Sequence, residues 1–283
     1  MFKRVSRLSF MAVILFVLVF TVGCGGNVPS DDNYGQQGDD GSLSGTIQIA
    51  GSTSVQPLSE ELAMEFMARN PKVKISVAGG GSGAGIKSAQ NGTADIGASS
   101  RELKPQEKTV KEFVIARDGI AVIVHPDNPI EDIRLDDLKK VFTGEITNWK
   151  EIGGKNAPIA IVIREEGSGT RSAFQELTIG EDAKFSDNAI IQNSTGAVRT
   201  AVAQNPDAIG FISIGAISDD IKTIAIDGVE PAKENVLNNS YKISRPFIYM
   251  TKDEPEGIVK SFIDFVLSHE GQQIVQKEFI NVK

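Results

Sequence analysis

From residue 46 onward the chain alternates short apolar runs with amphipathic stretches, and this alternation restricts the fold more than any other feature of the sequence. Residues 119–124 (GIAVIV) and 159–163 (IAIVI) are almost continuously apolar, which is typical of strands covered on both faces. Leu58, Leu62 and Phe66 recur every four residues, which predicts a helix. Strands that alternate with helices indicate α/β layers with mostly parallel strand pairing.

The same two patterns recur to the end of the chain. About 240 residues in this alternation exceed the commonest size of a single hydrophobic core, so we expect two α/β lobes. The predicted strands are residues 46–50, 73–77, 94–98, 119–124, 159–163, 209–212 and 247–251, and the predicted helices are residues 57–69, 135–142, 170–178, 196–204, 256–268 and 271–279.

Clusters of glycine, serine and threonine stand between predicted strands and helices. Residues 51–54 (GSTS), 79–85 (GGGSGAG) and 167–170 (GSGT) are the clearest, and residues 193–196 (NSTG) form a weaker fourth cluster. A helix start exposes unpaired N–H groups and the positive end of the helix dipole, and hydroxyl groups add further donors. One such cluster is usually an ordinary helix cap. Several in one chain favour a shared site for an anion.

Arg164 adds a positive charge to the third cluster. It ends the apolar run IAIVI, at the edge where ligands gather in open α/β sheets. The planar, paired donors of a guanidinium suit a tetrahedral oxyanion. The alternative is a surface arginine paired with Glu165 or Glu166, and these glutamates could also orient the arginine from behind.

The first 23 residues have the pattern of a secretory signal. Lys3, Arg4 and Arg7 precede an apolar run over residues 8–22. This run is short for a membrane-spanning helix, which needs about 20 apolar residues. Removing residues 1–23 would remove these three positive charges and no negative ones, so the remaining chain would be more acidic.

The chain's one cysteine, Cys24, follows this apolar run directly. The string TVGC at residues 21–24 resembles a bacterial lipobox, although Thr21 stands where a larger aliphatic side chain is usual. Residues 24–44 are rich in Gly, Asp, Ser and Gln and cannot bury enough apolar surface to fold alone. We therefore predict a lipoprotein signal peptide over residues 1–23, lipid attachment at Cys24 and a flexible tether. The protein would be extracytoplasmic and anchored to the cell membrane.

Composition argues against several other classes of protein. The chain has 29 Lys+Arg against 37 Asp+Glu and a formal net charge of -8, which is the opposite of a nucleic-acid binder. A single cysteine cannot form an intramolecular disulfide or a thiolate zinc site. The two histidines, His125 and His269, leave little material for a metal centre or for acid–base chemistry, and His269 is expected to end a helix. We predict no metal and no cofactor.

No pattern for catalysis or nucleotide binding is complete. The run GGGSGA at residues 79–84 fits the dinucleotide fingerprint, but in so glycine-rich a stretch the match is nearly automatic. Ile86 intrudes before Lys87, where the phosphate-binding loop of ATPases needs its lysine at a fixed position. Neither Ser82 nor Ser168 has both flanking glycines of a nucleophile elbow. We predict no catalytic residues.

Six strings together resemble one known family. The chain from about residue 45 to residue 279 is similar to the phosphate-binding lipoproteins of the high-affinity phosphate ABC importer, the Pst-type substrate-binding proteins. The strings are GSTSVQPL at 51–58, GGGSGAGIK at 79–87, ADIGASSREL at 94–103, LKKVFTGEITNW at 138–149, IREEGSGTRSAF at 163–174 and NPDAIGFISIG at 205–215.

The resemblance implies a type II periplasmic-binding-protein fold, in which two α/β lobes are joined by a two-strand hinge. The first lobe would comprise residues 45–117 and 240–283, and the second lobe residues 118–239. The two crossings between the lobes would lie near residues 117–119 and 239–244.

The resemblance also implies where phosphate would bind. The implied ligand-binding residues are Ser52, Thr53, Ser54, Ser82, Ser100, Arg164, Ser168, Gly169 and Thr170. Some members of the family carry an aspartate at the position of Ser100, and that aspartate accepts the proton of hydrogen phosphate. A serine could accept the proton through a lone pair, more weakly than an ionised group. The neighbouring Arg101 is either a further ligand contact or an outward surface residue.

The function implied is capture of inorganic phosphate between the lobes and its delivery to the permease subunits of an ABC transporter. The protein would be a monomer held to the membrane by its N-terminal lipid, with no nucleic-acid partner. The alternatives are a binding protein for another tetrahedral oxyanion such as sulfate or molybdate, an extracytoplasmic phosphoester-processing enzyme, and a phosphate sensor or adhesin that feeds no transporter.

Overall fold

The computed structural model describes residues 42–283. The predicted signal peptide, Cys24 and all but residues 42–44 of the predicted tether lie outside the described residues. Across residues 42–283, every helix is too short or too polar to cross a membrane.

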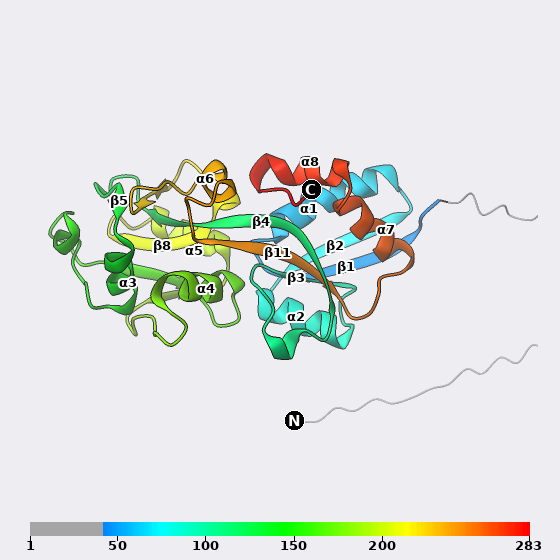
Figure 1. Ribbon diagram of the computed structural model, residues 1–283, viewed down its shortest axis with the longest axis horizontal. Helices are drawn as coiled ribbons and strands as arrows, with labels where there is room; N and C mark the ends of the chain where they lie inside the picture. Colours follow the sequence, from blue (N-terminus) through cyan, green and yellow to red (C-terminus); the bar gives the residue numbers. More distant parts are fainter. Residues whose placement is uncertain (1–41) are drawn as a thin grey trace, which may run out of the picture. The chain divides into compact units, whose positions relative to one another are not determined.

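Eight strands form one hydrogen-bonded series in the order β2-β1-β3-β11-β4-β8-β6-β7, and β9 pairs with β4 (Figure 1). A separate two-stranded sheet pairs β5 with β10. The strands are β1 Gly45–Gly51, β2 Val73–Gly79, β3 Ile96–Ser99, β4 Lys111–Val124, β5 Asp132–Ile133, β6 Ala160–Arg164, β7 Ile190–Gln192, β8 Ala208–Ser213, β9 Lys222–Thr223, β10 Ala225–Ile226 and β11 Ser244–Thr251.

The helices follow strands at nearly every crossover. The α-helices are α1 Gln56–Arg69, α2 Ser82–Asn91, α3 Leu135–Thr143, α4 Gly169–Phe174, α5 Thr195–Ala203, α6 Lys233–Leu237, α7 Gly257–Val266 and α8 His269–Glu278. The predicted helix over residues 170–178 is divided, because α4 continues from Gln175 to Ile179 as a π-helical turn.

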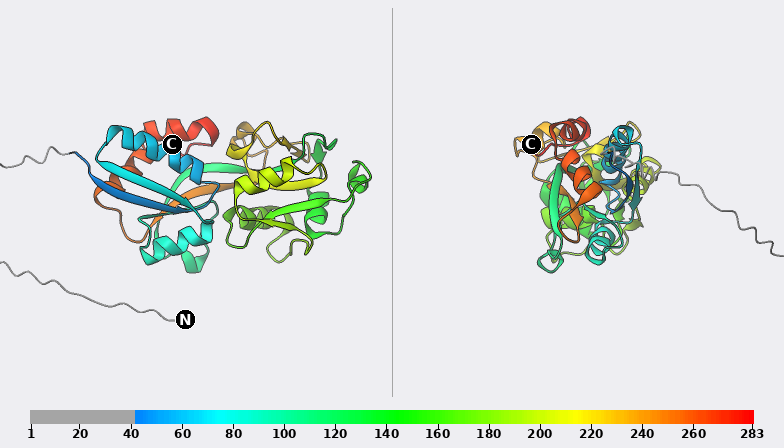
Figure 2. Two further views of the ribbon diagram at one scale, coloured as in Figure 1. Left: turned by 180° about the vertical axis from the view of Figure 1, so that it is seen from behind. Right: turned by 90° about the vertical axis from the view of Figure 1, so that its right-hand side faces the viewer.

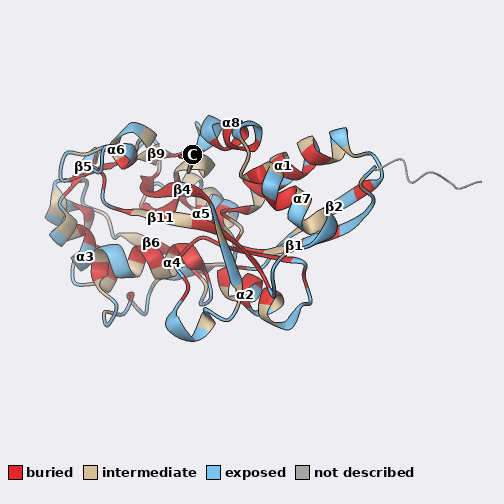
Figure 3. Ribbon diagram, turned by 45° about the vertical axis from the view of Figure 1, so that its right-hand side comes forward, coloured by how far each residue is buried: buried red, intermediate tan, exposed pale blue. Residues whose placement is uncertain are grey.

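Two main hydrophobic cores divide the described chain into two lobes. The first lobe is built around Ile47, Leu62 and Phe262, with Phe66 and Phe262 in edge contact. The second lobe is built around aromatic side chains, in which the rings of Phe174 and Phe211 stack 4.0 Å apart. Buried residues concentrate along β3, β8, β11 and the second half of β4, whereas β2 is largely exposed (Figure 3). The predicted fold class, two α/β lobes, is confirmed.

The strand pairing is mixed rather than mostly parallel. Strands β1, β2 and β3 pair in parallel within the first lobe, and β6, β7 and β8 do so in the second. Strand β4 pairs antiparallel with β11 and β8, and β11 pairs antiparallel with β3. The antiparallel pairs arise because β4 and β11 carry the chain between the lobes in opposite directions.

Both crossing strands are long and continuous (Figures 1 and 2). Strand β4 starts at Lys111, eight residues before the predicted strand, and its residues 117–119 pair with Ser244–Pro246 of β11. Tyr241 and Ile243 pack in the core of the second lobe, and the Tyr241 hydroxyl donates to the backbone oxygen of Ile120 at 2.7 Å. Ser244, the last residue of the predicted second crossing at residues 239–244, is also the first residue of β11.

A buried ion pair joins the two crossing strands. Asp118 on β4 and Arg245 on β11 are register partners, and their side chains are 0% and 2% exposed. Arg245 donates twice to Asp118 Oδ2, at 3.2 and 3.0 Å, and Ser213 donates to Oδ1 at 2.9 Å. Burial raises the pKa of Asp118 to about 6, against the opposing effects of Arg245 and Ser213. Burial likewise lowers the pKa of Arg245.

This pKa predicts a pH-dependent contribution to stability. The folded pKa of Asp118 lies above its unfolded value, so its contribution is fully present below pH 4 and is lost as pH rises through about 6. We expect the unfolding free energy of the wild type, minus that of Asp118→Asn, to increase on the order of 2–3 kcal/mol from pH 7.5 to pH 4. Denaturant titrations at several pH values measure this difference.

The exposed Asp219 on the same lobe provides a matched control, because Asp219→Asn removes a carboxylate that remains in water. A difference that decreases as pH falls would mean that attraction to Arg245 outweighs the cost of burial.

Candidate anion-binding site

Four helix starts from the two lobes meet at one place. In the first lobe, the turn after β1 carries Ser52, Thr53 and Ser54, and α2 begins at Ser82. In the second lobe, α4 begins at Gly169 and α5 begins at Thr195. The three clearest Gly/Ser/Thr clusters of the sequence and the weaker fourth therefore lie together.

Three serine hydroxyls of the first lobe form a buried group. Ser52 Oγ donates to Ser100 Oγ at 2.8 Å, and the Ser100 N–H donates to Ser82 Oγ at 3.0 Å. The Oγ atoms of Ser82 and Ser100 lie 3.3 Å apart. Ser82 and Ser100 have no exposed surface and Ser52 is 4% exposed. Ser100 therefore lies at the centre of the first-lobe half of the site, directly after β3.

Hydrogen bonds connect this half of the site to the second lobe. Ser54 Oγ lies 2.8 Å from both Thr170 Oγ1 and Thr195 Oγ1. On the backbone, the Gly83 N–H donates to the Gly167 oxygen at 2.9 Å. These contacts place the two lobes in a closed arrangement, in which the hydroxyl groups satisfy one another.

Arg164 is the buried cation of the site, with 2% of its surface exposed. Its Nε and Nη2 each donate to one carboxylate oxygen of Glu165 at 2.7 Å, and its Nη1 donates to Thr195 Oγ1 at 3.2 Å. Arg164 is thus paired with Glu165 and buried at the same time, which rules out the surface arginine considered from the sequence. The glutamate holds one edge of the guanidinium and leaves the other edge toward the hydroxyls.

Two residues expected at the site have additional local roles. Ser168 Oγ caps α4 by accepting from the Arg171 N–H at 3.2 Å. Gly169 faces the first lobe so closely that a Cβ there would lie 2.2 Å from Ser82 Oγ and 2.7 Å from Ser100 Oγ. A side chain at position 169 would therefore collide with the opposite half of the site.

Thr195 contacts Ser54 and Arg164 through its hydroxyl, although it was not among the implied ligand-binding residues. Its only signal in the sequence was the weak cluster NSTG. Thr53, which was among them, is connected to the group mainly through Thr195, with the two hydroxyls 3.3 Å apart and the Thr195 N–H donating to Thr53 Oγ1 at 3.2 Å.

The Arg101 guanidinium has its hydrogen-bond partners outside the cluster of serine and threonine hydroxyls. Its guanidinium donates to both carboxylate oxygens of Glu107 at 2.7 and 2.8 Å and to the Glu102 backbone oxygen at 2.8 Å. Hydrogen bonding to Arg101 holds the pKa of Glu107 below its usual range. Arg101 is 9% exposed, so it is not an outward surface residue, and its guanidinium donates to Glu107 and Glu102.

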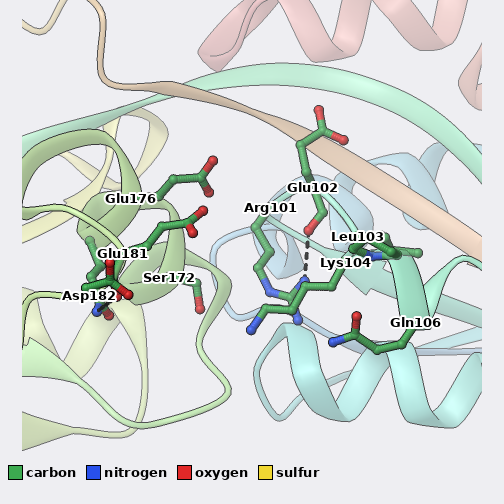
Figure 4. Close-up of a pocket in the computed structure, with 11 residues that line it drawn as sticks. Arg101, Glu102, Leu103, Lys104, Gln106, Ser172, Glu176, Glu181 and Asp182 are labelled. Atoms are coloured by element: carbon green, nitrogen blue, oxygen red, sulfur yellow. Dashed lines mark hydrogen bonds between the residues drawn. The ribbon is translucent and has the colours of Figure 1, made fainter.

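Beside the cluster of serine and threonine hydroxyls, Arg101 lines a cavity of about 610 Å³ between the lobes (Figure 4). The first lobe contributes residues 101–106, and the second lobe contributes Ser172, Gln175, Glu176, Glu181 and Asp182. A second cavity of about 370 Å³ shares Arg101, Glu102 and Glu176 and extends to the crossing strands at Arg117 and Arg245. The two cavities therefore lie between the lobes beside the contacts at which the lobes touch, and the second cavity reaches the crossing strands.

Neither histidine is a hydrogen-bond partner of the serine and threonine hydroxyls of the site. His125 follows β4 and accepts from the Asp127 N–H. His269 begins α8, whose cap is Ser268, so the prediction that it ends a helix was wrong. Within residues 42–283, His, Cys, Asp and Glu side chains nowhere gather in a group that could hold a metal ion.

A buried arginine and converging helix starts, placed between two lobes on crossing strands, define a solute-binding protein of the two-lobe class. In agreement, the model of the PBP superfamily domain matches residues 36–270. A solved structure from Clostridium perfringens, a putative phosphate ABC transporter substrate-binding protein with bound phosphate, is 47% identical with a TM-score of 0.81, covering 84% of this chain and 100% of that one. An ABC-type phosphate transport receptor from Vibrio cholerae is 34% identical with a TM-score of 0.70, with the same coverage.

Sequence comparison gives a narrower family. The phosphate-binding protein PstS of Bacillus subtilis is 33% identical over 277 residues, which cover 95% of this chain and 91% of that protein. The chain belongs to the PstS family of phosphate-binding proteins.

The close approach at Gly169 gives a test of the closed arrangement. We expect Gly169→Ala to hold the lobes apart, because its Cβ would collide with Ser82 and Ser100 across the cleft. Small-angle X-ray scattering with inorganic phosphate added should give a larger radius of gyration than for the wild type. The unfolding free energy should change by less than about 1 kcal/mol, because opening relieves the collision.

Gly196→Ala is the matched control, since Gly196 also lies at a helix start and a Cβ there meets nothing within 4 Å. Scattering curves for Gly169→Ala and wild type that coincide would contradict the closed geometry.

Proposed function

We propose that this protein captures inorganic phosphate between its two lobes and delivers it to the permease subunits of an ABC transporter. The observation that carries the proposal is the buried Arg164 guanidinium, which donates to Thr195 Oγ1 at the edge of a cluster of hydroxyl groups from both lobes. Membership of the PstS family and the phosphate bound in the Clostridium perfringens relative support it.

The donors of this site fit the charge and shape of a tetrahedral anion. A hydroxyl group can rotate its proton, so the hydroxyls that now bond to one another would turn toward an anion between them. Arg164 and the helix starts supply positive charge to an anion that has lost its water. The net charge of -8 does not oppose this, because the donors act at hydrogen-bond distance.

The ligand residues we propose are those that the family resemblance implied. They are Ser52, Thr53, Ser54, Ser82, Ser100, Arg164, Ser168, Gly169 and Thr170. Both oxygens of Glu165 are engaged by Arg164, so we propose that the oxygen of Ser100 or of a neighbouring hydroxyl accepts the hydrogen bond that hydrogen phosphate donates. Sulfate, which carries no such proton at neutral pH, is the competing ligand.

Closure about the crossing strands would trap the anion. We propose a first lobe of residues 45–117 and 244–283 and a second lobe of residues 118–243, with β4 and β11 bending near Asp118 and Arg245. The permease would recognise the closed form, and the binding protein would act as a monomer outside the cytoplasm. Binding without turnover is part of the proposal, since the hydroxyls have no neighbouring histidine to act as a base.

Arg164→Ala should abolish most of the phosphate affinity while the fold remains. Loss of a charge-assisted contact in a buried site typically weakens binding by about a hundredfold or more. Titration calorimetry with phosphate and with sulfate, each at pH 6 and pH 8, measures both affinity and selectivity. We expect micromolar or tighter binding of phosphate by the wild type and much weaker binding of sulfate.

Arg134→Ala is the matched control, because Arg134 lies on the same lobe with its side chain 72% exposed. Equal affinities for phosphate and sulfate would contradict selectivity for phosphate and would indicate a binding protein for tetrahedral oxyanions in general. Unchanged phosphate affinity in Arg164→Ala would refute the role of this arginine.

We propose further that Cys24 carries the lipid that holds the protein at the membrane. Cys24→Ala should shift the protein from the membrane fraction to the soluble extracytoplasmic fraction and abolish incorporation of a radiolabelled fatty acid. The calorimetric affinity for phosphate should not change. Labelling that persists in Cys24→Ala would contradict lipid attachment at this residue.

A further inference from the structure

Thr195 occupies a position in the site that ordinary helix capping does not explain. The cap of α5 is Ser194, whose side chain accepts from the Ala197 N–H at 3.1 Å. The Thr195 hydroxyl is therefore not needed to begin the helix. The side chain is nonetheless 95% buried, since its exposed fraction is 5%, and it faces the first lobe across the cleft.

The contacts of Thr195 Oγ1 come from both lobes. It lies 2.8 Å from Ser54 Oγ and 3.3 Å from Thr53 Oγ1 in the first lobe, and it accepts from Arg164 Nη1 at 3.2 Å in its own lobe. Thr195 is thus the atom-to-atom connection between the buried guanidinium and the β1–α1 turn.

Arg164 needs such a connection on its second edge. Glu165 engages Nε and Nη2, which fixes one edge of the guanidinium plane. The hydrogen bond from Nη1 to Thr195 Oγ1 fixes the opposite edge. A guanidinium has donors only, so the Thr195 oxygen must be the acceptor, and its own proton remains free to be donated toward the first lobe.

We propose that Thr195 is a positioning residue of the phosphate site. Its hydroxyl oxygen accepts a hydrogen bond from Arg164 Nη1 and so orients the guanidinium toward the ligand. When the lobes close, the same hydroxyl donates its proton to the β1–α1 turn. The inference rests on the proposed function. It assigns the fourth helix start to orienting Arg164.

The test compares phosphate affinities by titration calorimetry on the full-length mature protein. Thr195→Val keeps the shape of the side chain and the backbone N–H that donates to Thr53, but removes the hydroxyl. We expect its dissociation constant for phosphate to rise about ten- to hundredfold, as for loss of a hydrogen bond to a charged group. Thr195→Ser, which restores the hydroxyl, should recover affinity to within about threefold of the wild type.

Thr200→Val is the matched control, because it makes the same change at an exposed position of the same helix. Its affinity should equal that of the wild type. The unfolding midpoint of the ligand-free protein should be similar in all three variants, which separates a positioning role from a purely structural one.

A second background tests whether Thr195 acts through the arginine. Arg164→Lys keeps the positive charge but removes the guanidinium nitrogen Nη1 that donates to Thr195. Adding Thr195→Val to this variant should therefore weaken phosphate binding less than about twofold. An equal loss in both backgrounds would overturn the proposal and show that Thr195 acts on the anion independently. If wild-type protein binds phosphate and Thr195→Val binds it equally well, only this inference fails. If the wild type does not bind phosphate, the proposed function itself fails.

Discussion

The bidentate pairing of Arg164 with Glu165 is the interaction on which the site depends. Burying an arginine is costly unless its donors are satisfied, and here Glu165 satisfies one edge at 2.7 Å for each contact. This leaves Nη1 directed at Thr195 and the hydroxyls beyond it. The carboxylate therefore allows a positive charge to remain buried where the lobes meet, without occupying the side on which we propose that the anion binds.

Two long strands set the geometry between the lobes. Strands β4 and β11 pair antiparallel along residues 111–119 and 244–251, and Asp118 and Arg245, near the end of this pairing at the crossing, form a buried ion pair. Since both charges are desolvated, the pair is a poor source of stability, although it joins two residues that are register partners at the crossing. The site and the crossing are also connected electrostatically, because the charge of Arg164 contributes to lowering the pKa of Arg245.

The elements that the sequence predicted well are those with one strong pattern. The apolar runs that became β6 and β8, and the stripe of Leu58, Leu62 and Phe66 in α1, report burial directly. The first half of β4 was not predicted, because the stretch from Lys111 to Asp118 mixes charged and apolar side chains along the hinge. Strands of two or three residues such as β5 and β7 carry too few side chains to show any period.

The sequence by itself determined the α/β class, the Gly/Ser/Thr turns at helix starts and an arginine at the end of an apolar run, because each is a local pattern of side chains. Only the tertiary structure decided that the hydroxyls of Thr170 and Thr195 both lie 2.8 Å from the hydroxyl of Ser54, since these two residues follow Ser54 by 116 and 141 positions along the chain. It also decided that Arg101 turns to Glu107 while Arg164 turns to the cleft. Partner choice among charged groups depends on distance and burial, and neither can be read from spacing along the chain.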